Sequence, residues 1–141
     1  MLKAIIILIE MIFLHCIADY YLQGILSNMK QKRWWAVQLH NESELNRSKY
    51  KNDYKAALIA HSIEWSFMIL LPMLFLTYYN NYNLPHSLLY ILLFIYNVLL
   101  HTFIDNAKAN RSSFNLINDQ LFHLLQLTIS WLLWWGVVGW N

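Results

Sequence analysis

The sequence predicts an all-helical integral membrane protein with four membrane-spanning helices. Hydrophobic residues make up 58% of the 141 residues and charged residues only 13%, whereas ordinary globular domains carry roughly 25% charged residues. Apolar segments recur at about residues 4–22, 56–77, 85–105 and 117–139. Each is long enough to cross a ~30 Å hydrocarbon core as a helix. We therefore expect residues 1–141 to form a single membrane domain of two helical hairpins.

The composition argues against other classes of protein. Three glycines and two prolines provide too few turns for a many-stranded sandwich or barrel, and the high hydrophobicity excludes a disordered chain. A single cysteine, Cys16, excludes a disulfide framework and a zinc-finger scaffold. The formal net charge of +2 is too small to indicate nucleic-acid binding, so no nucleic-acid partner is expected.

The basic residues predict the orientation of the helices. Nine of the ten lysines and arginines lie in residues 23–55 and 106–116, and residues 78–86 contain none. The positive-inside rule then places both basic segments in the cytoplasm and both termini outside. We expect a multi-pass protein of a bacterial inner membrane. The first segment is expected to be a retained helix, because no small-residue cleavage site follows it.

The long basic segment 23–55 is predicted to be a cytoplasmic loop that contacts the membrane surface. Residues 31–54 combine most of its lysines and arginines with Trp34 and Trp35. Each basic residue near an anionic membrane surface contributes ~1 kcal/mol of attraction. Besides the bilayer itself, an anionic lipid is therefore the expected partner at this loop, and an oligomer is compatible with the lipid-facing surface of four short helices.

Each predicted span carries a histidine and a carboxylate near its cytoplasmic end. The pairs are His15 with Asp19, His61 with Glu64, His101 with Asp105, and His123 with Asp119. Residues three or four apart share one face of a helix. The orientation was derived from lysines and arginines alone, so the convergence of the four pairs in one leaflet is an independent observation. It predicts one polar site inside the helical bundle.

Imidazole and carboxylate groups on facing helices are how helical bundles hold pairs of metal ions. Nitrogen and oxygen ligands favour Zn, with Mn or Fe also open, and the number of ligands suggests two divalent ions. The candidate ligands are His15, Asp19, His61, His101, Asp105, Asp119 and His123. Glu64 or Asp119 is a candidate general base. Lys30, Lys108, Gln23 and Gln120, at the cytoplasmic mouth, are candidates for binding an anionic group.

Structural explanations exist for some of these carboxylates. Asp119 lies in the first turn of its helix, where the macrodipole favours negative charge, and Glu64, early in its helix, is open to the same explanation. Asp19 and Asp105 lie near the C-terminal ends, where negative charge is disfavoured, so each needs a cation. That cation is a metal, a protonated histidine, or a lysine such as Lys30 or Lys108.

Three functions therefore stay open at the level of sequence. The first is a metal-dependent hydrolase that acts on a phosphoester in a lipid or lipid-linked substrate, through a metal-bound water. The second is a proton or metal-ion transporter that uses the same residues as a relay. The third is a non-enzymatic phage or bacterial membrane protein with a structural His/Asp network.

The ordered motifs resemble those of a small bacterial and phage membrane family catalogued as domain of unknown function 3307. They are His15-x-x-x-Asp19-Tyr-x-x-Gln23, Lys30, His61, His101-x-x-x-Asp105-x-x-Lys108 and Asp119-Gln120-x-x-His123. The resemblance covers nearly the whole chain, apart from a long basic insertion between Lys30 and His61. It implies the fold, the site and a bacterial or phage origin, but no reaction. The His-x-x-x-acid pattern is also remotely similar to the zinc-dependent phospholipase C and P1 nuclease group, helical proteins that cleave phosphoesters.

Overall fold

The computed structural model describes residues 2–79 and 84–138, and over these ranges the protein contains helices and no strand. This confirms the predicted all-helical class. The elements are α1 (Leu2–Ile17), a π-helix η1 (Ala18–Leu22), α2 (Leu26–Met29), α3 (Lys32–Gln38), α4 (Glu44–Tyr50), α5 (Asp53–Tyr79), α6 (Leu84–Arg111) and α7 (Leu116–Val138).

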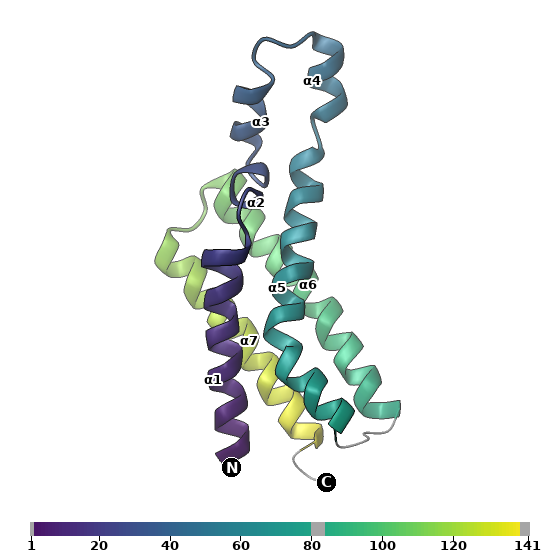
Figure 1. The fold of residues 1–141 in the computed structure, drawn as a ribbon. Helices are drawn as coiled ribbons and strands as arrows, with labels where there is room; N and C mark the ends of the chain where they lie inside the picture. The colour runs from purple at the N-terminus through teal and green to yellow at the C-terminus, as the bar shows by residue number, and fades with distance from the viewer. Residues whose placement is uncertain (1, 80–83, 139–141) are drawn as a thin grey trace.

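The four long helices α1, α5, α6 and α7 pack around a common centre, and we call them the bundle. Both α1 and α6 contact α5 and α7, so the contacts close a ring. The start of α1 and the end of α7 lie at the same end of the molecule (Figure 1). The short helices α2, α3 and α4 project from the opposite end, and we call residues 26–50 the extension.

Two of the helices, α5 and α6, are longer than the apolar segments that predicted them. The helix α5 begins at Asp53, three residues before the predicted start, and α6 runs six residues past Asp105 to Arg111. Basic residues in the last turn of α6, Lys108 and Arg111, stabilise this end by complementing the helix macrodipole. Residues 23–55, predicted as a loop, contain α2, α3, α4 and the start of α5. The predicted end of the last helix, residue 139, lies outside the described residues.

Two helical segments are long and apolar enough to cross a membrane, judged by length and composition alone. They are Glu44–Tyr79, which contains α5, and Leu84–Arg111, which is α6. Large apolar side chains are also exposed along the outer faces of all four bundle helices. Examples are Ile9 and Phe13 on α1, Ile63 and Phe67 on α5, Leu92, Ile95 and Leu99 on α6, and Leu121, Leu125 and Leu132 on α7.

The centre of the bundle is divided into an apolar part and a polar part. The apolar part lies toward the start of α1 and contains side chains from all four bundle helices. Those of α1, α5 and α7 are fully buried, namely Met11, Ile69, Leu70, Met73, Leu127 and Trp134, and Leu93 of α6 is nearly so. The polar part lies toward the extension and holds buried histidines and aspartates. The apolar core therefore closes one end of the bundle, and the polar cluster occupies the other.

Gly24, in the turn after η1, has a positive φ of 43°, a conformation that costs other residues roughly 1–2 kcal/mol. A Cβ there would meet only the Leu22 carbonyl oxygen at 3.6 Å, an ordinary contact. We expect Gly24→Ala to lower the free energy of unfolding by about 1 kcal/mol. The matched change Gly136→Ala, in α7 with nothing within 4 Å, should raise it by about 0.5 kcal/mol. Denaturant unfolding in mixed micelles measures both, and equal effects would contradict the conformational explanation.

Candidate metal centre

The π-helix η1 positions the first carboxylate of the polar cluster. The backbone N–H of Gln23 donates to the carbonyl of Ala18 at 3.2 Å, five residues earlier. The side-chain amide of Gln23 donates to the backbone carbonyl of Asp19, so this carbonyl is satisfied although the helix ends there. Short π segments inside helices are frequent at functional sites. The wide π-helical turn directs the Asp19 side chain into the bundle, where the residue is only 6% exposed.

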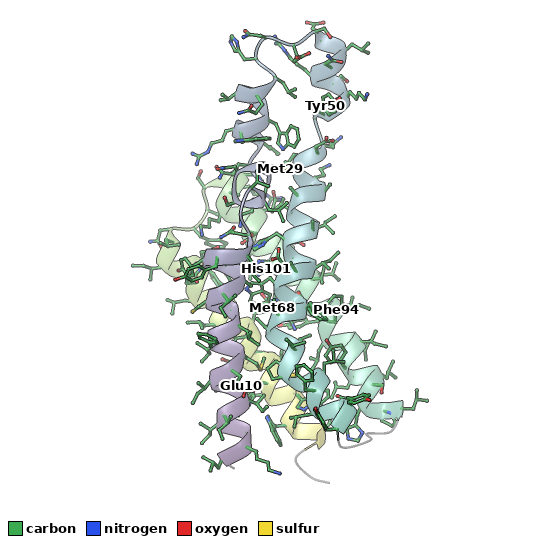
Figure 2. All side chains as sticks on the ribbon, viewed as in Figure 1. Glu10, Met29, Tyr50, Met68, Phe94 and His101 are labelled. Atoms are coloured by element: carbon green, nitrogen blue, oxygen red, sulfur yellow. The ribbon has the colours of Figure 1, made fainter. Side chains whose placement is uncertain are left out.

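Six of the residues predicted to form the site come together in the bundle. They are Asp19 from η1, His61 from α5, His101 and Asp105 from α6, and Asp119 and His123 from α7, and all six are buried. Figure 2 labels His101 near mid-height, with Glu10 toward the start of α1 and Met29 and Tyr50 on the side of the extension. The cluster therefore sits where the bundle meets the extension.

Distances within the cluster suit shared metal ligands better than direct hydrogen bonds. The Nε2 atom of His61 lies 3.4 Å from Oδ1 of Asp19 and 3.6 Å from Oδ2 of Asp105. The Nε2 atom of His101 lies 3.7 Å from Oδ2 of Asp105. Ligands at 2.0–2.2 Å from a tetrahedral ion stand about 3.3–3.6 Å apart, whereas N–H···O hydrogen bonds are usually 2.7–3.2 Å.

Two lysines neutralise one half of the cluster. Nζ of Lys30 lies 2.6 Å from Oδ2 of Asp105, and Nζ of Lys108 lies 2.5 Å from Oδ2 of Asp119. His123 lies between the same two carboxylates, with Nε2 at 3.3 Å from Asp105 and 3.5 Å from Asp119. We call these five residues the lysine half. Asp105 was predicted to need a cation because it lies near the C-terminal end of its helix, and Lys30 is one such cation.

The other half of the cluster, formed by Asp19, His61 and His101, has no such cation. Asp19 forms no ion pair with a lysine or arginine among the described residues. Its Oδ2 accepts a hydrogen bond from Nε2 of Gln120 at 3.0 Å. Its Oδ1 and all four ring nitrogens of His61 and His101 are buried without a hydrogen-bond partner. Each such atom costs about 1–3 kcal/mol. Oδ1 of Asp119 and both ring nitrogens of His123 in the lysine half are unpartnered too, so the lack of a lysine is what makes this half the better place for a cation.

These three residues form a group that could hold a metal ion, because one ligand atom from each lies within 4.8 Å of the others. A second group contains His101, Asp105 and His123. His101 belongs to both groups. A given nitrogen of its ring can bind the ion of one group or of the other, but not both. The Asp19 group fits a cation better, since Asp105 already pairs with Lys30.

His15 lies beside the cluster with both ring nitrogens engaged. Its Nδ1 accepts a hydrogen bond from Nε1 of Trp65 at 2.9 Å, so the proton of the neutral ring is on Nε2. That nitrogen then donates to Oε1 of Gln120 at 3.0 Å, and Gln120 donates to Asp19. The chain from Trp65 to Asp19 therefore orients the carboxylate, and His15 has no free nitrogen for a metal.

Glu64, the other predicted base, lies half-buried on α5. It belongs to neither group of potential ligands among the described residues. Of the predicted anion-binding residues, Lys30 and Lys108 pair with aspartates of the cluster, and Gln23 and Gln120 hydrogen-bond to Asp19. All four thus surround the cluster, and Lys108, with 33% of its side chain exposed, marks the side that is open to solvent.

The sequence did not identify Trp65, a fully buried residue that packs against the cluster. Its ring stacks on His101 with centroids 4.2 Å apart and lies edge-on to His15 at 5.7 Å. The position of Trp65 could have indicated this contact, because Trp65 follows His61 by four residues and shares its helix face. One turn deeper, Gln126 donates to Asn97 at 2.9 Å, and Asn97 donates to Ser130 at 2.8 Å. This layer separates the cluster from the apolar core.

We expect Trp65→Phe to weaken metal binding about 10–100-fold, the usual cost of losing a partner that orients a ligand. Phenylalanine keeps a ring beneath His101 but removes the donor that fixes His15 and, through it, Gln120. The matched change is Trp131→Phe, which removes an indole hydrogen bond to the carbonyl of Ala4, far along the chain from the cluster. Competition with a chromogenic chelator measures the affinity of both. An equal loss in the two variants would show that Trp65 acts only through general packing.

In the comparisons with known proteins, no family model, no curated protein and no solved structure matches this chain. The resemblance to the domain of unknown function 3307 stays a prediction from the motifs.

Proposed function

We propose that this protein is an integral membrane metalloprotein that binds one divalent transition-metal ion, zinc by its ligand set, through Asp19, His61 and His101. The observation that carries this proposal is the half of the cluster that lacks a lysine. There, a buried carboxylate oxygen and the nitrogens of two buried imidazoles converge without hydrogen-bond partners. One carboxylate and two imidazoles are the ligand set of several catalytic zinc sites, which leave the fourth position open.

Charge balance supports one ion in preference to the two suggested by the sequence. The cluster contains three carboxylates and two ammonium groups, so its formal charge is −1 with neutral imidazoles. A single divalent ion brings the total to +1, which a hydroxide or a phosphoester oxygen neutralises. Two divalent ions would leave +3 in a buried position, where unbalanced charge is strongly unfavourable.

The reaction we propose is hydrolysis of a phosphoester in a lipid or lipid-linked substrate. A bound divalent ion would supply a Lewis acid and lower the pKa of its water toward 7. His123, held between Asp105 and Asp119, is placed to accept or return a proton, and Asp119 positions its ring. Lys108 is the partly exposed ammonium group beside the cluster and would bind the anionic group of a substrate as it enters.

The membrane topology belongs to the same proposal. The exposed apolar side chains on the outer faces of α1, α5, α6 and α7 form more apolar surface than a soluble monomer leaves exposed. All four helices would cross a bacterial inner membrane, with the termini outside and the extension in the cytoplasm, as the basic residues predict. The metal centre would then lie near the cytoplasmic end of the hydrocarbon core.

A transporter is the second candidate, favoured by the polar layer of Asn97, Gln126 and Ser130 beyond the cluster. Past that layer the described bundle is filled by fully buried Ile69, Met73, Leu127 and Trp134. A relay across the membrane needs polar groups or water along its whole length. We therefore favour a site that is reached from one side.

Metal analysis of detergent-purified protein, prepared without chelators, tests the metal centre. We expect about one zinc, manganese or iron ion per chain, and much less in Asp19→Ala. The exposed-surface control Glu42→Ala should bind as the wild type does. Absence of transition metal from the wild type would overturn the proposal in favour of a structural His/Asp network.

Turnover of phospholipids and of a generic phosphodiester by the metal-loaded protein tests hydrolysis. Metal uptake into proteoliposomes without turnover would favour the transporter.

A further inference from the structure

A second site candidate lies in the extension, apart from the metal centre. An open pocket of about 460 Å³ is lined by α3, α4, the first turn of α5 and the residues between them, a volume within the usual 300–1,000 Å³ of ligand sites. Its chemistry is set by three cationic and three aromatic side chains, namely Lys32, Arg47, Lys51, Trp35, Tyr50 and Tyr54.

The cationic side chains of this pocket have no acidic partner. No aspartate or glutamate lines the pocket, and Lys32, Arg47 and Lys51 form no ion pair with any described residue. Hydrogen bonds from Arg47 to the carbonyls of His40 and Glu42, at 2.6 and 3.0 Å, hold its guanidinium in place. Three like charges around one cavity repel one another, and a phosphate group bound between them removes that repulsion.

Aromatic side chains form the apolar wall of the pocket and are fixed before any ligand binds. The rings of Trp35 and Tyr50 are nearly parallel, with 12° between their planes and 6.5 Å between centroids. Trp35 also donates to the carbonyl of Met29 at 2.7 Å, and Nζ of Lys32 lies 5.0 Å from the ring centroid of Tyr54. The pocket thus joins a rigid apolar wall to a cationic rim, which matches a ligand with both an apolar and an anionic part.

The position along α5 indicates where this ligand comes from. Between His61 and Tyr79 the helix rises about 27 Å, close to the ~30 Å thickness of the hydrocarbon core. Tyr54 precedes His61 by seven residues, or about 10 Å. If the bundle spans the membrane as proposed above, the pocket lies at or just beyond the headgroup layer, where tryptophan and tyrosine are enriched.

We propose that this pocket binds the phosphate headgroup of an anionic phospholipid. Lys32 and Lys51 contact the phosphate, and Trp35 and Tyr50 pack against the glycerol. The proposal rests on the membrane orientation of the proposed function and is independent of the metal centre.

Native mass spectrometry of the full chain, loaded with mixed phosphatidylglycerol and phosphatidylcholine, tests the site. Removal of Lys32 and Lys51 together, as K32Q/K51Q, should reduce retention of phosphatidylglycerol roughly 25-fold, because each direct charge-assisted contact with the phosphate contributes at least about 1 kcal/mol, or about fivefold. The control R33Q/K55Q removes the same charge from exposed residues that do not line the pocket, and should change retention by less than about twofold, because exposed charges that do not touch the phosphate are screened by water and salt. Equal losses in the two variants would mean diffuse attraction to the basic surface and would overturn the proposal.

A second arm separates the lipid from a soluble phosphate. Glycerol 3-phosphate and inorganic phosphate are titrated onto the protein in phosphatidylcholine nanodiscs, and we expect no saturable binding. Saturable binding that K32Q/K51Q abolishes would assign the pocket to a soluble phosphate and contradict the lipid. The variant Asp19→Ala should retain phosphatidylglycerol as the wild type does, so failure of the metal centre and failure of this site are distinguished.

Discussion

Replacement of His101 by alanine is expected to abolish metal binding. His101 is fully buried and belongs to both groups of potential ligands, so no intact group of three survives its loss. Loss of an orienting partner alone costs 10–100-fold in affinity, and loss of a ligand should exceed about 100-fold. Metal content after gel filtration and chelator competition measure the change.

The matched control for this prediction is His40→Ala. His40 is exposed in the extension and hydrogen-bonds to its neighbour Asn41, so its loss should leave metal content unchanged. Circular dichroism and gel filtration show whether His101→Ala keeps the fold. A folded His101→Ala protein that still binds one ion with wild-type affinity would refute a centre built on this histidine.

The second large effect is expected at the ion pair between Lys30 and Asp105. Asp105→Ala leaves the Lys30 ammonium group, whose side chain is only 12% exposed, without its carboxylate. Breaking a buried pair by removing one partner costs about 3–5 kcal/mol. We therefore expect the free energy of unfolding of the metal-free protein to fall by that amount, measured by denaturant titration in mixed micelles. Glu42→Ala, an exposed change, should cost less than about 0.5 kcal/mol.

Replacing both partners should restore most of the lost stability. In Lys30→Met with Asp105→Leu, no charge from this pair stays buried, and apolar replacements of buried ion pairs are often neutral or stabilising. The double variant is therefore expected to be more stable than Asp105→Ala. A double variant as unstable as Asp105→Ala would indicate that Asp105 stabilises the bundle through the histidines and not through Lys30.

Helix periodicity and charge were sufficient to predict much of this site. The spacing of three or four residues placed His101 with Asp105, and Asp119 with His123, on single helix faces. The distribution of lysines and arginines then predicted that the four pairs face one another. In the structure Asp19, His61, His101, Asp105, Asp119 and His123 are indeed neighbours.

The hydrogen-bond partners could not be predicted, and Lys30 could only be named as one candidate cation for Asp105, because both depend on contacts between distant segments. Lys30 reaches Asp105 across 75 positions, and Trp65 reaches His15 across 50. Within α5, Trp65 looks like any other apolar residue, so no pattern indicated that His15 has both nitrogens engaged. Glu64 has the right spacing from His61, but it is outside both groups of potential ligands. Helical spacing predicts which residues share a helix face, but it does not predict which residues of other segments contact that face.

The cluster draws its members from η1, α5, α6 and α7, which has a consequence for biosynthesis. The ribosome delivers Asp19 about 100 residues before Gln120, the amide that hydrogen-bonds to it, and His61 is made about 40 residues before its neighbour His101. During folding the first hairpin must therefore carry uncompensated polar groups, and α7 is the helix that completes their network. Assembly should stay reversible, and open to proteases, until α7 has docked. A ribosome-stalled chain that lacks α7 is expected to be degraded faster than the full chain, as pulse-chase labelling would show.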